Sequence, residues 1–239
     1  MRVEDKTDAA PKMPKNKVPT ATNLSSSDSK SPITRPMNFT EWAPPTDERF
    51  DVDPENFLAQ RIAEFIAQET ADQVLEVVDI GCGSGALGRI LGESSPHLQI
   101  DGIDISKSLL ALAEKALRND GNPCYRELLE ADLRKPVYFA ANHYDVLISS
   151  GLFVPGLLGA SDLIAMVQSV KARGRVIVAI DKSHFDNAAF KIVIREAVWA
   201  ETITEPTYTE VDTFDVKSDR FGAKALIAQF SKVPTLNDL

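Results

Sequence analysis

Alternating glycines beside an acidic residue form the stretch of this chain best suited to chemistry. Asp79 ends an apolar run, Gly81, Gly83 and Gly85 follow it, and a segment with helical apolar spacing begins just beyond them. This order indicates a strand, a tight turn and a helix. Glycine permits positive φ and close backbone approach, and the first turn of the helix presents unpaired N–H groups and the positive end of its dipole. We therefore predict a nucleotide-like ligand at this turn.

Two classes of ligand use a turn of this kind. Gly83, Gly85 and Gly88 satisfy G-x-G-x-x-G, and Asp104 follows about twenty residues later, as a dinucleotide site requires. The second class is a ligand that carries a positive ammonium or sulfonium group. Asp79 favours this class, because a carboxylate beside the turn attracts such a group and repels a pyrophosphate. The chain also has no Tyr-x-x-x-Lys pair, which a short-chain dehydrogenase needs. A NAD-dependent oxidoreductase is the minor alternative.

The pattern that starts at Asp79 is Asp-x-Gly-x-Gly-x-Gly, and here the chain resembles the class I S-adenosylmethionine-dependent methyltransferases. The resemblance covers most of residues 39–231. It implies a Rossmann-like fold and S-adenosyl-L-methionine as the cofactor. Residues 39–47 are similar to the opening of small-molecule methyltransferase domains, including those like the Williams-Beuren-region methyltransferase, although Phe39 and Thr46 replace its two tyrosines.

The resemblance also implies roles for acids at strand ends. Asp104 would accept hydrogen bonds from the ribose diol, which suits a carboxylate with two oxygens. Asp132 would accept from the adenine amino group, and Asp79 would contact the methionyl end. The expected cofactor-binding residues are Asp79, Gly81, Cys82, Gly83, Gly85, Asp104, Ile105, Asp132, Leu133 and Ser149. For each acid alone, a solvated strand-end carboxylate or a helix cap is an equally good interpretation.

The acceptor side of the site is defined less sharply. Residues 149–153 read Ser-Ser-Gly-Leu-Phe where amino-group methylases carry Asp/Asn-Pro-Pro, which argues against a base amine as the acceptor. We expect a small molecule in a pocket lined by Trp42, Ser150, Phe153 and Phe185. A general base is needed only if the acceptor loses a proton, and His184 is the candidate, with Asp181 and Asp186 as alternatives. Asp186 is also expected to cap the next helix. A protein acceptor, or a non-catalytic cofactor-binding partner or sensor subunit, are the other hypotheses.

The elements that position these residues alternate along the chain. Apolar runs predict five strands. The first ends at Asp79–Ile80, and the others cover residues 98–104, 124–130, 144–148 and 175–180. Helices are expected over 54–68, after Ser106, after Ser161 and over 186–201. Two β-rich runs, 207–216 and 221–231, predict an antiparallel hairpin. The fold class is therefore α/β, with a doubly wound, Rossmann-like sheet of seven strands that is mostly parallel and has an antiparallel C-terminal strand.

Charge and composition divide the chain. The net charge of −9 is uneven, because residues 1–36 carry seven Lys or Arg and four Asp or Glu, which leaves about −12 on the rest. Residues 1–36 are predicted to be a disordered tail, 37–70 a lid and helix, and 71–239 the cofactor-binding domain. The acidic body indicates no nucleic-acid partner. No long apolar run or leader pattern is present, so we expect a cytoplasmic protein without a membrane span.

The two cysteines, Cys82 and Cys124, have no metal-ligand spacing, and no metal site is expected. The sequence leaves the oligomeric state open.

Overall fold

The computed structural model describes residues 55–67, 73–135, 140–213 and 222–236. All of these residues belong to the compact unit Pro36–Leu239. The predicted tail, the residues before 55 in the predicted lid, and Trp42 lie outside the described residues.

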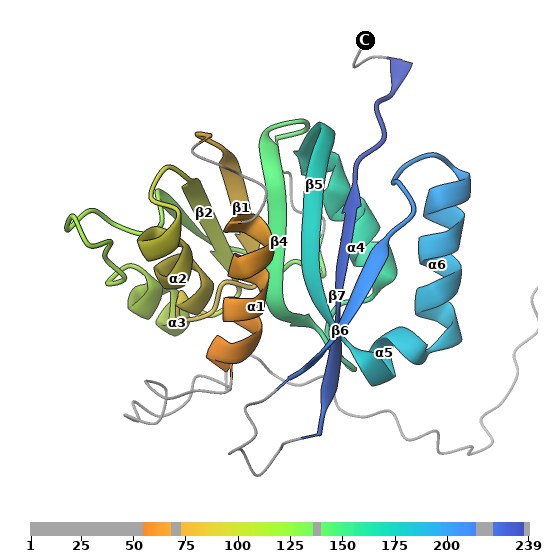
Figure 1. Cartoon of the computed structure of the whole chain (residues 1–239), viewed down its shortest axis with the longest axis horizontal. Coiled ribbons are helices and arrows are strands. Elements are labelled where there is room, and N and C mark those ends of the chain that lie inside the picture. Colours follow the sequence, from red (N-terminus) through yellow and green to blue (C-terminus); the bar gives the residue numbers. More distant parts are fainter. Residues whose placement is uncertain (1–54, 68–72, 136–139, 214–221, 237–239) are drawn as a thin grey trace, which may run out of the picture. The chain divides into compact units, whose positions relative to one another are not determined.

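Seven strands form one sheet in the order β3-β2-β1-β4-β5-β7-β6 (Figure 1). The strands are β1 (Glu76–Ile80), β2 (Gln99–Asp104), β3 (Glu127–Glu130), β4 (Tyr144–Phe153), β5 (Val170–Asp181), β6 (Thr207–Asp212) and β7 (Lys224–Ser231). Strands β1 to β5 pair in parallel, whereas β7 is antiparallel to both β5 and β6. This confirms the predicted fold class, including the antiparallel strand at the end of the chain.

Helices cover both faces of the sheet. They are α1 (Glu55–Ala67), α2 (Ala86–Ser94), α3 (Lys107–Ala113), α4 (Ala160–Met166), α5 (Lys182–Asp186) and α6 (Ala188–Trp199). Val77 belongs to a core cluster with side chains of α1, α2 and α3, and the adjacent Val78 belongs to a second cluster with side chains of α4 and α6. Successive strand residues point to opposite faces, so an almost wholly apolar strand such as β1 contributes to both cores.

Several predicted boundaries were wrong. Strand β3 begins at Glu127, after the expected residue 124. Strand β4 continues five residues past Ile148, and β5 begins at Val170, before the expected 175. The helix expected over 186–201 is α6, which begins at Ala188 and ends at Trp199, and the short α5 directly precedes it. Asn187, rather than Asp186, caps α6, because its side-chain oxygen accepts the N–H of Ala189 at 3.0 Å. Within the described ranges, none of the helices has the length and apolar character that a membrane crossing requires.

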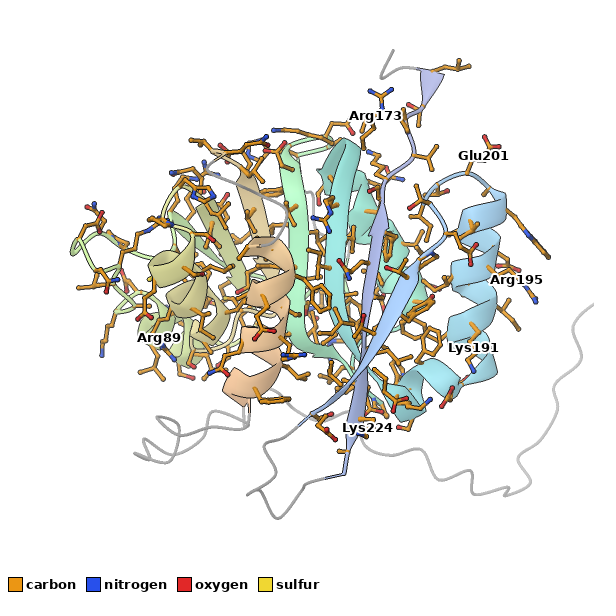
Figure 2. All side chains as sticks on the ribbon, viewed as in Figure 1. Arg89, Arg173, Lys191, Arg195, Glu201 and Lys224 are labelled. Carbon is orange, nitrogen blue, oxygen red and sulfur yellow. The ribbon has the colours of Figure 1, made fainter. Side chains whose placement is uncertain are left out.

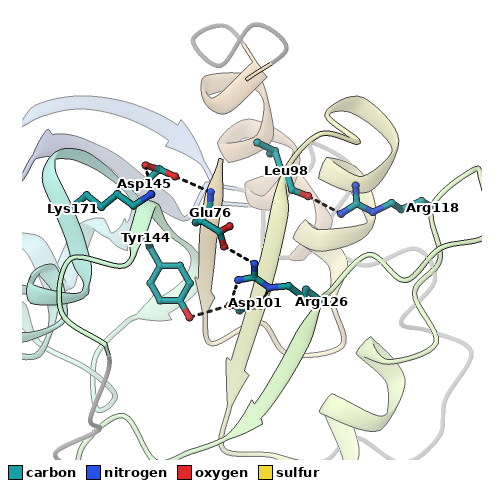
Figure 3. A network of polar contacts seen from close by, with 8 residues as sticks. All are labelled: Glu76, Leu98, Asp101, Arg118, Arg126, Tyr144, Asp145 and Lys171. Atoms are coloured by element: carbon teal, nitrogen blue, oxygen red, sulfur yellow. Dashed lines mark hydrogen bonds and ion pairs between the residues drawn. The ribbon is translucent and has the colours of Figure 1, made fainter. Parts of the chain in front are cut away.

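A polar network lies near the amino ends of β1, β2 and β4 (Figure 3). Arg126 donates from Nε and Nη2 to the two carboxylate oxygens of Asp101, at 2.9 and 2.7 Å. Its Nη1 forms an ion pair with Oε2 of Glu76 at 2.6 Å. The Tyr144 hydroxyl donates to Oδ2 of Asp101 at 3.1 Å. The buried Asp101 carboxylate is thus neutralised within the chain at the edge opposite the glycine turn.

Candidate functional site

The glycine turn joins β1 to α2 with three residues in the left-handed region. Gly81, Gly83 and Gly85 have φ values of 70, 55 and 85°. The carbonyl oxygen of Ile103 accepts the N–H groups of Gly81 and Cys82, at 2.7 and 3.1 Å, so the turn is bonded to β2. A Cβ on Gly83 would meet nothing within 4 Å. Glycine is therefore required here for its backbone conformation, and the turn has open space beside Gly83.

Asp104 ends β2 next to this turn. Its Oδ2 accepts the N–H of Gly83 at 3.0 Å, and its Oδ1 accepts the N–H of Ser106 at 2.8 Å. Burial raises the pKa of this carboxyl group, and the backbone hydrogen bonds counteract the increase. Each oxygen keeps a second acceptor direction, which is what recognition of a diol requires.

Asp79 lies almost completely buried at the end of β1, with 1% of its surface exposed. Its Oδ2 accepts the Tyr125 hydroxyl at 2.7 Å, but its Oδ1 is buried and has no partner among the described residues. Burial raises the pKa of Asp79 to about 7; the Tyr125 hydrogen bond lowers it, and the charge of Asp104 raises it. A buried carboxylate with one unsatisfied oxygen is costly, and such groups concentrate at binding sites.

Ser149 provides a second unsatisfied oxygen in the strand beside Asp79. β1 pairs with β4 through Asp79 and Ile148, and Ser149 follows directly. The Ser149 side chain is fully buried, and its Oγ has no partner in the described part of the chain. The strand order reverses between β1 and β4, and doubly wound sheets bind ligands at the carboxyl ends of strands at such a switch point.

Tyr125 and Leu152 also belong to this site, and the sequence analysis did not identify them. Tyr125 precedes β3 and is buried against the turn. The Leu152 side chain, from the extended end of β4, lies close to Gly81, where a Cβ would be 3.0 Å from it. The sequence signals that could have indicated Tyr125 were Gly88 and Gly102, because a glycine inside a helix or strand can mark the close approach of another group.

The predicted adenine-binding residues lie after β2 and β3. The Asp132 carboxylate accepts Nε and Nη2 of Arg134 at 2.8 and 3.0 Å, and this pairing lowers its pKa. An adenine amino group would have to share these oxygens with the guanidinium. Ile105 is partly exposed directly after Asp104, and Leu133 is partly buried against the second core cluster.

The structure does not bring the predicted acceptor residues together in one described pocket. Phe153 is fully buried in the second core cluster, whereas Ser150 is partly exposed on β4. Phe185 packs against Phe190 and Tyr208 instead. Lys191 projects from α6 (Figure 2), and its Nζ lies 5.4 Å from the Phe185 ring centroid.

His184 lies in α5, just beyond the end of β5. Its Nε2 is 2.9 Å from the carbonyl oxygen of Leu158, and its ring contacts Phe190 edge-on. A carbonyl only accepts, so Nε2 carries the proton and Nδ1 is the acceptor of the neutral ring. These two contacts join the ring to the layer of α4 and α6.

No group of three or more His, Cys, Asp or Glu among the described residues is arranged to hold a metal ion. Both cysteines are free and buried.

Comparison with known proteins agrees with this geometry. Residues 77–173 match the protein family described as methyltransferase domain. The chain is 31% identical over 101 residues to malonyl-(acyl-carrier protein) O-methyltransferase from Halalkalibacterium halodurans, a match that covers 40% of this chain and 36% of that protein. It is 34% identical over 116 residues to a protein from Leptospira interrogans described as an uncharacterized RNA methyltransferase, covering 46% of this chain and 25% of that protein. The chain thus spans about a third or less of these relatives' length.

A solved structure supports the fold. Magnesium protoporphyrin IX methyltransferase from Synechocystis PCC 6803, crystallised with bound SAM, has a TM-score of 0.52 at 15% identity, and the likeness covers 75% of this chain and 80% of that one. The sheet order and the glycine turn at the switch point define a Rossmann-like nucleotide-binding domain. Over residues 77–173 the chain is similar to a methyltransferase domain, and its fold is that of S-adenosylmethionine-dependent methyltransferases.

Proposed function

We propose that this chain binds S-adenosylmethionine at the carboxyl edge of β1, β2 and β4 and transfers its methyl group to a small-molecule acceptor. The observation that carries the proposal is the buried Asp79 carboxylate, which has one unpartnered oxygen and no ion pair among the described residues. A ligand with a positive ammonium group would satisfy that oxygen, whereas a pyrophosphate would be repelled. The neighbouring unpartnered Oγ of Ser149 is a second polar group that the same end of the ligand would satisfy.

The other residues have roles that follow from their position. Asp104 would accept the ribose hydroxyls through its remaining lone pairs, and Ile105 would pack against the adenine face. Asp132 and the backbone N–H of Leu133 would bind the adenine edge. The backbone from Gly81 to Gly85, with Cys82 between the glycines, would lie against the cofactor beside the open space at Gly83.

The bound cofactor would supply an activated methyl group on a sulfonium. Transfer of this group to an acceptor needs no covalent intermediate with the protein. The task of this chain is to hold donor and acceptor in line and to exclude water. Asp79 and Ser149 would fix the methionyl end, and Leu152, packed beside Gly81, would shield it. If the acceptor loses a proton, Nδ1 of His184 is the proposed base, because Asp181 caps α5 and Asp186 is bonded to Lys182 and Lys191.

A small-molecule acceptor remains our proposal. The relatives' names include a carrier-protein-bound malonyl group and RNA, so the likeness to methyltransferases leaves the acceptor open. The acidic body of the chain disfavours RNA, and residues 149–153 at the end of β4 differ from the Asp/Asn-Pro-Pro pattern of amino-group methylases. A protein acceptor and a non-catalytic partner subunit are the alternatives, and a cytoplasmic location is proposed.

Calorimetric titration with S-adenosylhomocysteine, and with NAD in parallel, tests the cofactor. We expect micromolar binding of S-adenosylhomocysteine and no heat with NAD. The reverse result would reject the proposed function and assign the glycine turn to a dinucleotide. With the cofactor established, a screen of thiol, hydroxyl, amine and carboxylate metabolites for methyl transfer identifies the acceptor. Cofactor binding without transfer to any of these, in the presence of a peptide array that is methylated, would favour the protein acceptor.

A further inference from the structure

Tyr125 occupies a slot that three glycines leave open. A Cβ on Gly88 would overlap the Tyr125 ring, and a Cβ on Gly102 or Gly85 would come within 2.9 and 3.0 Å of it. Gly88 and Gly85 are also two of the glycines that suggested a nucleotide-binding motif. In this structure Gly88 therefore makes room for a side chain of the protein itself, and the ring lies between the first turn of α2 and β2.

The hydroxyl at the end of this ring has a defined direction. It accepts the N–H of Gly88 at 3.1 Å and stands 2.7 Å from Oδ2 of Asp79. Because the Gly88 N–H can only donate, the single hydroxyl proton goes to Asp79. One oxygen of Asp79 is thereby occupied by the protein, while Oδ1 stays without a partner among the described residues.

We infer that Tyr125 is a positioning residue for the cofactor: it binds Oδ2 of Asp79 and thereby holds the carboxylate charged, with Oδ1 left for the ammonium group of the ligand. This role rests on the proposed function and adds to it a side chain 46 residues away from Asp79 in the sequence. If Tyr125 had a purely structural role, its ring alone would fill the slot and its hydroxyl would not be needed.

The electrostatic surroundings of Asp79 make the hydroxyl important. Asp104 at the end of β2 faces Asp79 as a second carboxylate, and Cys82 in the turn is a buried thiol. Burial and the charge of Asp79 hold the pKa of Tyr125 far above its usual value, so Tyr125 remains the proton donor. Its hydrogen bond is the contribution that lowers the pKa of Asp79, against burial and Asp104. Without it, Asp79 would be protonated at a higher pH.

Tyr125→Phe keeps the ring and removes the hydroxyl. S-adenosylhomocysteine affinity would be measured by calorimetry from about pH 6 to 9, with circular dichroism to verify folding. In the unaltered chain we expect affinity to fall as pH falls through about 7, because protonation removes the charge of Asp79. In Tyr125→Phe we expect roughly tenfold weaker binding at neutral pH, the usual effect of a lost hydrogen bond to a charged group. The pH at which binding fails should rise by about one unit.

Tyr144→Phe is the matched control, because Tyr144 also donates to a buried aspartate, Asp101, but at the opposite edge. It should leave the pH profile of binding unchanged. In an Asp79→Asn background, whose weak residual binding would be measured at high S-adenosylhomocysteine concentration, adding Tyr125→Phe should cause no further loss, since the charge that the hydroxyl supports is already gone. This double variant tests the coupling even if the single variants differ in stability.

The outcomes separate this role from the proposed function. Lower melting temperature of Tyr125→Phe with an unchanged pH profile of binding would overturn the inference and leave Tyr125 as a packing residue. Failure of the unaltered chain and of Tyr144→Phe to bind S-adenosylhomocysteine would reject the proposed function itself, and the positioning role with it.

Discussion

Asp79 and Asp101 are buried aspartates in neighbouring strands, and each accepts a hydrogen bond from a tyrosine hydroxyl. Asp79 accepts from Tyr125 near the carboxyl edge of the sheet, and Asp101 from Tyr144 near the amino edge. The difference lies in the remaining partners. Arg126 donates hydrogen bonds to both carboxylate oxygens of Asp101 (Figure 3). Oδ1 of Asp79 has no partner among the described residues.

This contrast is the basis for proposing that Asp101 is a structural carboxylate and that Asp79 binds a ligand. Desolvating a carboxylate is costly, and a guanidinium with hydrogen bonds to both oxygens offsets much of that cost. The amino edge obtains this compensation within the chain. At the carboxyl edge the compensation is missing from the described residues, and burial raises the pKa of Asp79 instead. The apo protein is therefore less stable there than it could be, and a cationic ligand would remove the penalty.

The same substitution at the two aspartates should have opposite effects on stability. Burial raises the pKa of Asp79 from 3.8 to about 7, so the stability that its protonated form contributes is complete below about pH 4 and is lost as pH rises through 7. At pH 8, Asp79→Asn should raise the free energy of unfolding of the apo protein by about 2–4 kcal/mol, while abolishing tight cofactor binding. Thermal melts between pH 4 and 8 should show the gain shrinking towards pH 4.

Asp101→Asn is the control for this prediction. It should lower stability at pH 8, because Arg126 loses its charged partner there, and should leave cofactor affinity unchanged. If both variants destabilise the protein at pH 8, then Asp79 carries no such penalty and the contrast between the two edges is incorrect.

Arg126→Met should have the next largest effect. It removes the cation from Asp101 and Glu76 while retaining an apolar stem, and loss of one partner of a partly buried pair costs about 2–3 kcal/mol. We expect a loss of about 2 kcal/mol, because 35% of the Arg126 side chain is exposed and water screens part of the interaction. Urea denaturation would measure the loss, and binding of S-adenosylhomocysteine to the folded protein should be unaffected. Unaltered stability would show that water already neutralises this network.

Asp104→Ala should weaken cofactor binding by about 1–3 kcal/mol, the usual cost of losing hydrogen bonds to a charged group. The variant also removes the contacts to the N–H groups of Gly83 and Ser106, so melting curves must accompany the calorimetry. A second variant, Asp104→Asn, keeps one acceptor oxygen and should bind with intermediate affinity. Equal affinity of all three proteins would remove Asp104 from the site.

Ser149→Ala should show the smallest effect. The Oγ is buried and has no partner in the described part of the chain, so its loss should leave the stability of the apo protein unchanged or slightly higher. Cofactor affinity should fall by about 0.5–1.5 kcal/mol if the hydroxyl contacts the ligand. Ser169→Ala is a suitable control, because its buried hydroxyl donates to the carbonyl of Met166 at 2.8 Å and lies outside the site. That control should lose stability without any change in affinity.

Local features of the chain could be predicted well. The Ser106 cap of α3 was expected, and its Oγ accepts the N–H of Leu109 as the motif requires. The expected cap of α6, Asp186, was wrong, because the neighbouring Asn187 can also cap and the position where α5 ends makes Asn187 the first residue before α6. The predicted end of β4 was also wrong, because Ser149-Ser150-Gly151 lacks the apolar residues that indicate a strand.

The sequence alone determined the elements and the class of turn, because apolar periodicity and the backbone freedom of glycine act over a few residues. It therefore indicated a doubly wound sheet and the acids at its strand ends. Only the tertiary structure decided which oxygens those acids keep free. The hydrogen bond from Tyr125 to Asp79 and the contact between Leu152 and Gly81 join residues far apart along the chain, and such contacts depend on how the strands are ordered and packed.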